Sequence, residues 1–181
     1  MFGYKHYVPI LKGKQGEFRA LSNLSTSMRS KLTPFFDMPR PDSTWKKTID
    51  AYLINKVLSI HQCWGFTREC FVDYTDFSLT QRTCSDEHYI KFSFDNFRNY
   101  NVQAIPVTGL DRDDNYNNAI SRIFHKDKRG IAVRLQNGDI ETPSTTKRSV
   151  GDLLTFLKVK DQDVYLFLDF RDVDRSELTQ K

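Results

Sequence analysis

The sequence predicts an α/β fold made of a parallel (β/α) repeat, similar to a TIM barrel but with about six strands, so that the barrel is partial or open. Six short apolar segments recur about every 25 to 38 residues, and segments with helical spacing separate them. This alternation is typical of parallel strands joined by crossover helices. A closed eight-stranded barrel needs roughly 200 residues or more. This chain has 181 residues and six predicted strands, which is two strand–helix units fewer than a closed barrel. An open doubly wound sheet is the alternative.

The predicted strands are short and apolar. The last two are almost continuous apolar runs, as expected of parallel strands that are covered on both faces. The six segments are residues 7–12, 32–38, 70–77, 102–108, 131–136 and 164–170.

The first two crossovers contain helix signals. Residues 17–24 place apolar side chains on one face, and Ser25 can cap a short second turn, so we expect a broken crossover. In the second crossover, Ser43 or Thr44 can cap a helix whose apolar residues recur at helical spacing. Gly65 is expected to end that helix.

The other three crossovers carry start signals of different kinds. Ser85 is followed by two acidic residues, which suit a helix N-terminus and predict the start of the third helix. The acidic run 111–114 precedes the fourth helix, which continues towards Gly130. In the fifth, Ser149 and Asp152 stand three residues apart in a capping-box-like arrangement.

Length and composition predict a single (β/α)-type domain over residues 1–181. Six strands leave two alternatives open: the chain is the N-terminal portion of a longer barrel, or the barrel is open and something else covers its edge. The chain is 39% hydrophobic and 28% charged, which is ordinary for a globular protein with a sizeable core. Its net charge of +4 is mild, so it permits a phosphate-bearing partner without requiring one.

The sequence lacks the motifs that identify several classes of protein. Residues 12–17, KGKQGE, match neither the GxGxxG loop of dinucleotide-binding domains nor the GxxxxGK[ST] phosphate loop. The three cysteines lack metal-ligand spacing, which predicts free thiols in a reducing cytosol. The sequence shows no signal peptide and no apolar run of about 18 residues. We therefore expect a cytoplasmic protein without a membrane span.

Candidate site residues gather where the predicted strands end. Ligands bind at the carboxyl ends of parallel strands in both α/β architectures. Asp37, Asp73 and Asp169 fall at these ends. Asp73 and Asp76 cannot both face inward from a regular strand, and Asp73 is favoured because it lies inside the apolar run. A structural role, in helix caps or ion pairs, stays open for all three acids.

These residue types suggest a chemistry. Three converging carboxylates could bind Mg²⁺, or could divide acid and base roles among themselves. Lys12, Lys14 and Arg134 could bind a phosphate group, and Arg171 shares the predicted inward face of Asp169. Together they suit metal-assisted hydrolysis of a phosphate-containing or nucleotide substrate.

Two stretches resemble the start of the phage and bacterial "beta protein" family: YVPILKGKQGEFRAL at 7–21 and KLTPFFDMPRP at 31–41. The segments IPV at 105–107, AVRL at 132–135 and LFLDFRDVD at 166–174 are similar to its middle portion. Because family members are roughly twice as long, the resemblance implies that the chain corresponds to their first half. The family commonly has Glu where this chain has Asp37. The resemblance implies a setting of phage–host conflict in bacteria and does not specify a reaction.

Two hypotheses of function remain. The first is a hydrolase with Asp37, Asp73 and Asp169 as metal or acid–base groups, and with basic residues on phosphate. The second is a non-catalytic interaction module, which self-associates or binds a protein partner through the open edge of the barrel. An uncovered parallel edge invites such association.

Overall fold

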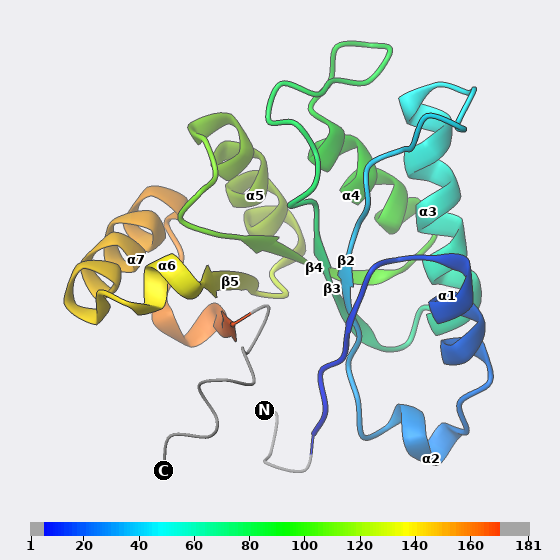
Figure 1. Cartoon of the computed structure of the whole chain (residues 1–181), viewed down its shortest axis with the longest axis horizontal. Helices are drawn as coiled ribbons and strands as arrows, with labels where there is room; N and C mark the ends of the chain where they lie inside the picture. Colours follow the sequence, from blue (N-terminus) through cyan, green and yellow to red (C-terminus); the bar gives the residue numbers. More distant parts are fainter. Residues whose placement is uncertain (1–5, 171–181) are drawn as a thin grey trace, which may run out of the picture.

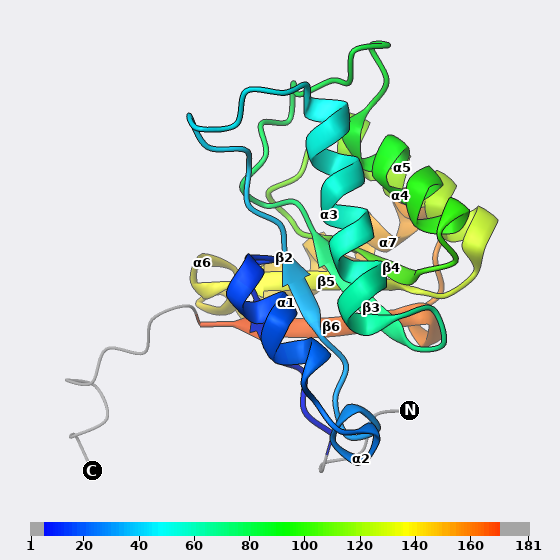
Figure 2. The ribbon, with the colours of Figure 1, turned by 90° about the vertical axis from the view of Figure 1, so that its right-hand side faces the viewer.

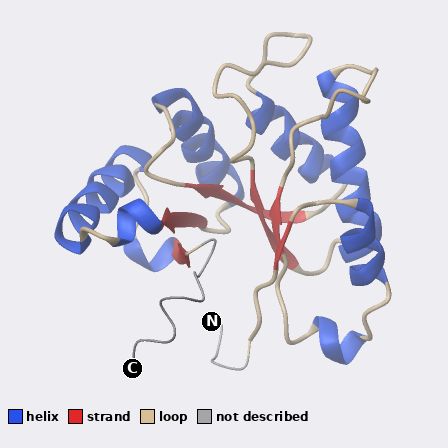
Figure 3. Cartoon of the chain, in the orientation of Figure 1, coloured by secondary structure: helices blue, strands red, loops and turns tan. Residues whose placement is uncertain are grey.

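A computed structural model describes residues 6–170 of the chain. Within these residues, six parallel strands form one sheet in the order β1-β2-β3-β4-β5-β6. The sheet curls into a half-barrel, and the main helices lie around its convex side (Figure 1, Figure 3). This confirms the predicted α/β open-barrel fold.

The strands are shorter than the apolar runs that predicted them. Their bounds are β1 Ile10–Leu11, β2 Phe35–Asp37, β3 Glu69–Asp73, β4 Gln103–Thr108, β5 Ile131–Gln136 and β6 Val164–Asp169. The predicted extension of the third strand to residue 77 is wrong, because the chain turns there and the Phe77 amide donates to the carbonyl of Tyr74. In β4, the register with β3 ends at Pro106, and pairing with β5 begins at Val107.

The first crossover is broken, as predicted. It forms α1 (Gln15–Ser22) and α2 (Thr26–Arg29), and the Ser25 hydroxyl accepts a hydrogen bond from the Met28 amide. The second crossover forms α3 (Ile49–Trp64), which Gly65 ends at φ 89°.

The start of α3 differs from the prediction. Thr48 caps it by accepting from the amide of Ala51 at 3.2 Å. Thr44 is not the cap, because its amide and hydroxyl both donate to Asp42 in a turn before the helix. Ser43 is likewise not the cap.

Later helices begin at residues that the sequence signals did not identify. The α4 helix (Tyr89–Asn99) starts after His88 rather than Ser85, since Thr83 accepts from the Glu87 amide in a preceding turn. The α5 helix (Asp114–Asp127) starts after Asp113, within the predicted acidic run. The chain then forms α6 (Asn137–Ile140) and α7 (Pro143–Leu157). Ser149 therefore lies inside a helix and caps nothing.

Each face of the sheet has its own core. Helices cover the convex face, where the larger apolar cluster lies. On the concave face, a smaller cluster has Phe35 and Phe71 fully buried at its centre. Phe167 of β6 reaches across the curl, with ring centroids 5.1 Å from Phe35 and 4.9 Å from Phe71. Figure 2 shows β6 running across the molecule beside β5. The half-barrel is therefore packed inside by aromatic rings, not hollow.

Strand register changes the character of this concave face along its length. Phe35 pairs with Phe71 on neighbouring strands, and two residues later Asp37 pairs with Asp73. On β5, the inward Ala132 is followed two residues later by Arg134, and on β6, the inward Tyr165 and Phe167 are followed by Asp169. Since alternate residues share a face, the apolar layer gives way to a polar layer at the carboxyl ends.

No helix within residues 6–170 is long and apolar enough to cross a membrane.

Candidate functional site

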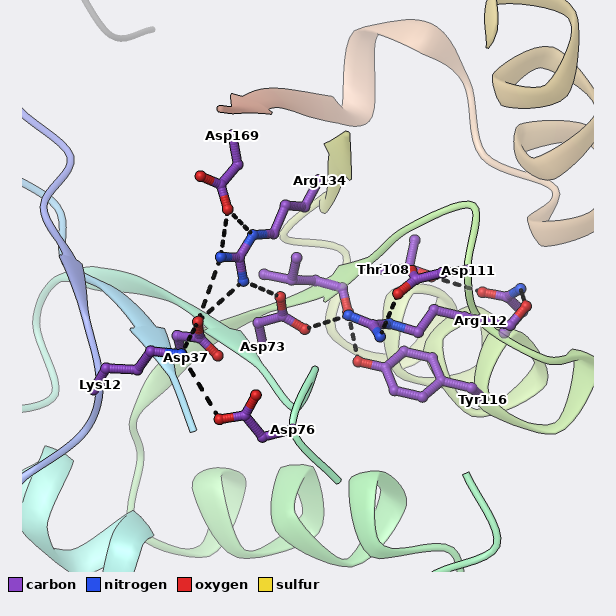
Figure 4. Close-up of polar contacts among 12 residues, drawn as sticks. Lys12, Asp37, Asp73, Asp76, Thr108, Asp111, Arg112, Tyr116, Arg134 and Asp169 are labelled. Atoms are coloured by element: carbon purple, nitrogen blue, oxygen red, sulfur yellow. Dashed lines mark hydrogen bonds and ion pairs between the residues drawn. The ribbon is translucent and has the colours of Figure 1, made fainter. Parts of the chain in front are cut away.

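Arg134 lies at the centre of the polar layer, and its guanidinium joins acids from three strands (Figure 4). Its side chain is 5% exposed. Nη1 donates to Asp73 at 2.8 Å, while Nε and Nη2 donate to Asp169 at 2.9 and 2.6 Å. Contacts of 3.3 and 3.4 Å reach Oδ2 of Asp37. The three predicted acids thus converge, and they converge on a cation from β5.

Lys12 lies at the open side of this cluster. Its Nζ donates to Oδ2 of Asp37 at 2.9 Å and lies 3.7 Å from Asp76. The Lys12 side chain is 49% exposed, whereas that of Asp37 is 1% exposed. The hydrogen bond to Asp37 raises the pKa of Lys12 above its ordinary value. Lys12 is therefore an ammonium group at neutral pH, positioned between solvent and a buried carboxylate.

Arg112 belongs to the same cluster, although the sequence analysis did not select it. It follows β4, donates from Nη2 to Asp73 at 3.1 Å and lies 5.1 Å from the ring centroid of Tyr116. The run 111–114 suggested only a helix start. An arginine just after the carboxyl end of a predicted strand could nevertheless have indicated that Arg112 belongs to the site. Gly109 makes room for this loop: a Cβ there would lie 2.7 Å from Asp111 Oδ1 and 3.0 Å from the Arg134 carbonyl oxygen.

Asp73 is the most enclosed acid of the cluster. It is fully buried and accepts from both arginines, while Asp76 stays at the rim with 43% of its side chain exposed. Burial raises the pKa of Asp73 above its ordinary value, although the charges of Arg112 and Arg134 act to lower it. Asp73, the last residue of β3, therefore lies inside, whereas Asp76 lies in the turn that follows the strand.

The buried acids of the cluster are matched by cations. Among the described residues, Asp37, Asp73 and Asp169 face the three cations Lys12, Arg112 and Arg134. The more exposed Asp76 and Asp111 also pair with Lys12 and Arg112 at the rim. Such pairing explains how the acids tolerate burial, which would be strongly unfavourable for unpaired charges.

One acceptor is left over within this balanced network. Oδ1 of Asp37 is buried and has no hydrogen-bond partner among the described residues, while Oδ2 is held by Lys12 and Arg134. Buried polar atoms are nearly always paired, so an unused acceptor calls for an explanation. A buried water molecule would satisfy it.

The carboxylates do not form a metal-binding arrangement in the part of the chain that the structure describes. No three Asp, Glu, His or Cys side chains between residues 6 and 170 are grouped so as to hold an ion. Arg134, rather than open space, lies between the acids (Figure 4). Binding of Mg²⁺, one of the two roles that the sequence suggested for these carboxylates, stays a prediction.

The remaining predicted residues lie outside this cluster. Lys14 is exposed in the loop after β1 and lines a cavity of about 470 Å³ beside the carboxyl end of β2. Arg171 lies outside the described residues.

Comparison with known proteins identifies the family. A family model described as "Beta protein" matches residues 7–181, almost the whole chain, and the chain therefore belongs to the beta protein family. No curated protein and no solved structure matches it.

Proposed function

We propose that this member of the beta protein family hydrolyses a phosphate-containing substrate at the carboxyl ends of its strands. Asp37 would act as the general base, and Lys12 would bind phosphate and donate a proton. The observation that carries the proposal is the oriented, buried carboxylate of Asp37, with one oxygen held by cations and the other unused among the described residues.

The geometry suits acid–base chemistry. Lys12 and Arg134 both donate to Oδ2 of Asp37, so the direction of Oδ1 is fixed. A general base held within hydrogen-bonding reach of its water contributes about 10²- to 10⁴-fold to a rate. Lys12 is half-exposed and can meet an incoming phosphate, whose charge it would neutralise.

The proposed step balances within these two residues. The oxygen of a water molecule bonds to phosphorus, and the bond from phosphorus to the leaving oxygen breaks. Asp37 takes a proton from the water, and the Lys12 ammonium gives a proton to the leaving oxygen. Asp37 then releases its proton, and the half-exposed Lys12 takes up a proton from solvent. Both residues end in their starting states.

The other charged residues position the base. Arg134 holds Asp37 from the inside, and it is held in turn by Asp73 and Asp169. Arg112 fixes Asp73 from the loop after β4. These are positioning residues, because they act through Asp37.

Turnover of two chromogenic esters, 4-nitrophenyl phosphate and bis(4-nitrophenyl) phosphate, tests the proposal. The wild-type chain should hydrolyse at least one. Asp37→Asn should lower that rate by about 100-fold or more, and Lys12→Met should also lower it. Asp161→Asn, at an exposed position in the turn before β6, is the matched control and should leave the rate unchanged. No hydrolysis of either ester, or an unchanged rate in Asp37→Asn, would overturn the proposal.

A second candidate function is self-association through β6. Its outward side chains Leu166 and Leu168 are 56% and 55% exposed, and Phe170, just after the strand, is 50% exposed. β6 is the last strand in the order of the sheet and pairs with β5. Strands at the edge of a sheet can pair with strands from other chains, and a second copy carries the same strand, so two copies could pair about a two-fold axis.

Sedimentation velocity tests self-association over a range of protein concentrations. The wild-type chain should form a dimer whose fraction rises with concentration. Leu168→Lys should weaken the dimer, whereas Met28→Lys, at an equally exposed residue of α2, should not. A wild-type monomer at every concentration would exclude this candidate.

A further inference from the structure

The cavity beside the carboxyl end of β2 lies outside the charged cluster. Its volume is about 470 Å³. The loops after β1 and β2 and one side of α3 form its walls. The lining residues are Lys14, Pro39, Arg40, Asp42, Thr44, Trp45, Tyr52, Asn55 and Lys56. Strand-end loops of this kind carry the ligand sites of (β/α) folds.

The charge of the cavity favours an anion. Three cationic side chains line the cavity, those of Lys14, Arg40 and Lys56, and its one acidic side chain is that of Asp42. Lys56 is fixed, because its Nζ donates to the carbonyl oxygen of Gly13 at 2.8 Å and lies 5.2 Å from the ring centroid of Tyr52. An ammonium group has three donors, so Lys56 retains capacity for a ligand oxygen.

One wall of the cavity is aromatic and rigid. The rings of Trp45 and Tyr52 meet edge to face, with centroids 5.3 Å apart. The Trp45 Nε1 donates to the carbonyl oxygen of Thr48, and the Tyr52 hydroxyl donates to that of Pro39. Both polar tips are therefore occupied, which leaves the half-buried indole as a flat apolar surface next to the cations. A planar aromatic group stacks well on such a surface.

Gly13 joins this cavity to the charged cluster. It has φ 57°, and a Cβ there would lie 3.2 Å from Sδ of Met38, the residue after Asp37. The loop after β1 thus packs closely against the end of β2. The residue before Gly13 binds Asp37, and the residue after it lines the cavity.

We propose that the cavity binds a nucleoside monophosphate, with its base on Trp45 and its phosphate on Lys14, Arg40 and Lys56. The combination of an aromatic wall and three cations matches a ligand that has both a planar ring and a phosphate. Neither Asp37 nor Lys12 lines the cavity, so this binding site stands on the cavity alone and goes beyond the proposed hydrolysis.

Isothermal titration calorimetry with AMP tests the site, and adenosine and ribose 5-phosphate serve as half-ligand probes. AMP should bind more tightly than either half. Trp45→Leu should raise the Kd of AMP about ten-fold through lost stacking. Arg40→Met should raise it by a similar factor through a lost charge-assisted contact. Lys47→Met, an exposed lysine of the same segment that does not line the cavity, is the control and should change the Kd less than two-fold.

The outcomes separate this inference from the proposed function. If AMP binds and Trp45→Leu and Arg40→Met weaken it, the site is supported, whether or not any ester is hydrolysed. If esters are hydrolysed but AMP does not bind, the hydrolase proposal survives and this inference fails. Equal affinity for AMP and ribose 5-phosphate, unaffected by Trp45→Leu, would also overturn the nucleotide assignment.

Discussion

The two ends of the concave face are built on the same strands but from opposite kinds of residue. At the amino end, Phe35, Phe71 and Phe167 interlock in an apolar layer. At the carboxyl end, Asp37 and Asp73 surround Arg134. An apolar layer stabilises by burial alone, whereas a buried ion cluster is weak evidence of stability. The contrast indicates that the apolar amino end stabilises the curl, and it motivates our proposal that the charged carboxyl end is retained for chemistry.

Arg134 connects the two ends. Its guanidinium carbon lies 5.3 Å from the ring centroid of Phe35, while its nitrogens face the acids. A cation over an aromatic face gains electrostatic attraction and loses little packing. The apolar layer therefore supports the charged layer from below, and perturbing each end should give different results.

Removing an aromatic ring at the amino end should have the largest effect on folding. Phe71 is fully buried against Tyr165 and Phe167. Phe71→Ala should lower the free energy of unfolding by about 3–5 kcal/mol, measured by urea denaturation. If Phe71→Ala does not fold, Phe71→Leu should still cost about 1 kcal/mol. A smaller loss than in Asp37→Asn would contradict the division between the ends.

Removing the central cation should also destabilise strongly, for a different reason. Arg134→Met keeps the apolar stem but leaves buried acids without their partner, so unfolding free energy should fall by about 3–5 kcal/mol. Asp73→Asn in the same chain should restore part of that loss, because it removes one uncompensated charge. The exposed Arg122→Met on α5 is the control, expected within about 0.5 kcal/mol of wild type. Additive effects of Arg134→Met and Asp73→Asn would argue against a coupled cluster.

Gly13 offers a smaller and more local test. Its φ of 57° is unfavourable for residues with a Cβ, and Gly13→Ala would also bring that atom close to Met38. We expect a loss of about 1–2 kcal/mol, with weaker AMP binding than wild type. Gly16→Ala is the matched control, since a Cβ there meets nothing within 4 Å. Equal behaviour of the two variants would show that close contact between the strand-end loops is unimportant.

The smallest expected effect is the pH dependence from Lys12. The hydrogen bond to Asp37 raises the folded-state pKa of Lys12 above the ordinary value of 10.5. Its contribution to stability is therefore fully present below pH 10.5 and is lost as pH rises through the folded-state pKa. The difference in unfolding free energy between wild type and Lys12→Met should shrink over that alkaline range. A difference that is constant with pH would contradict the pairing. Because Lys12 is half-exposed, solvent screens the effect.

The sequence predicted the fold class and most residues of the charged cluster, but it did not predict which of these residues pair with one another. Alternation within apolar runs placed Asp73 and Asp169 inward, because strand period is a local property. That Arg134 would bind these acids instead of a ligand depends on the curl of the sheet, which brings β5 and β6 opposite β2 and β3. The periodicity of apolar residues carries no information about how close the curl brings strands that are far apart in the sequence.

Helix starts were predicted less well, for a related reason. Ser85 and Ser149 have residues that suit caps, yet a turn at Thr83 and Pro143 in the first turn of α7 decide where α4 and α7 begin. The cavity at Trp45 was also missed, since it combines loops after two strands with a face of α3. The sequence signal was the cluster of Arg40, Trp45 and Lys56, which has no fixed spacing.

The most direct test of the central claim is to measure ester turnover and unfolding free energy together for Asp37→Asn. We predict that turnover of the better nitrophenyl ester falls about 100-fold or more, while the free energy of unfolding falls by less than in Phe71→Ala. Unchanged turnover with a loss of several kcal/mol would show that the carboxyl-end cluster is structural, like the apolar layer beneath it.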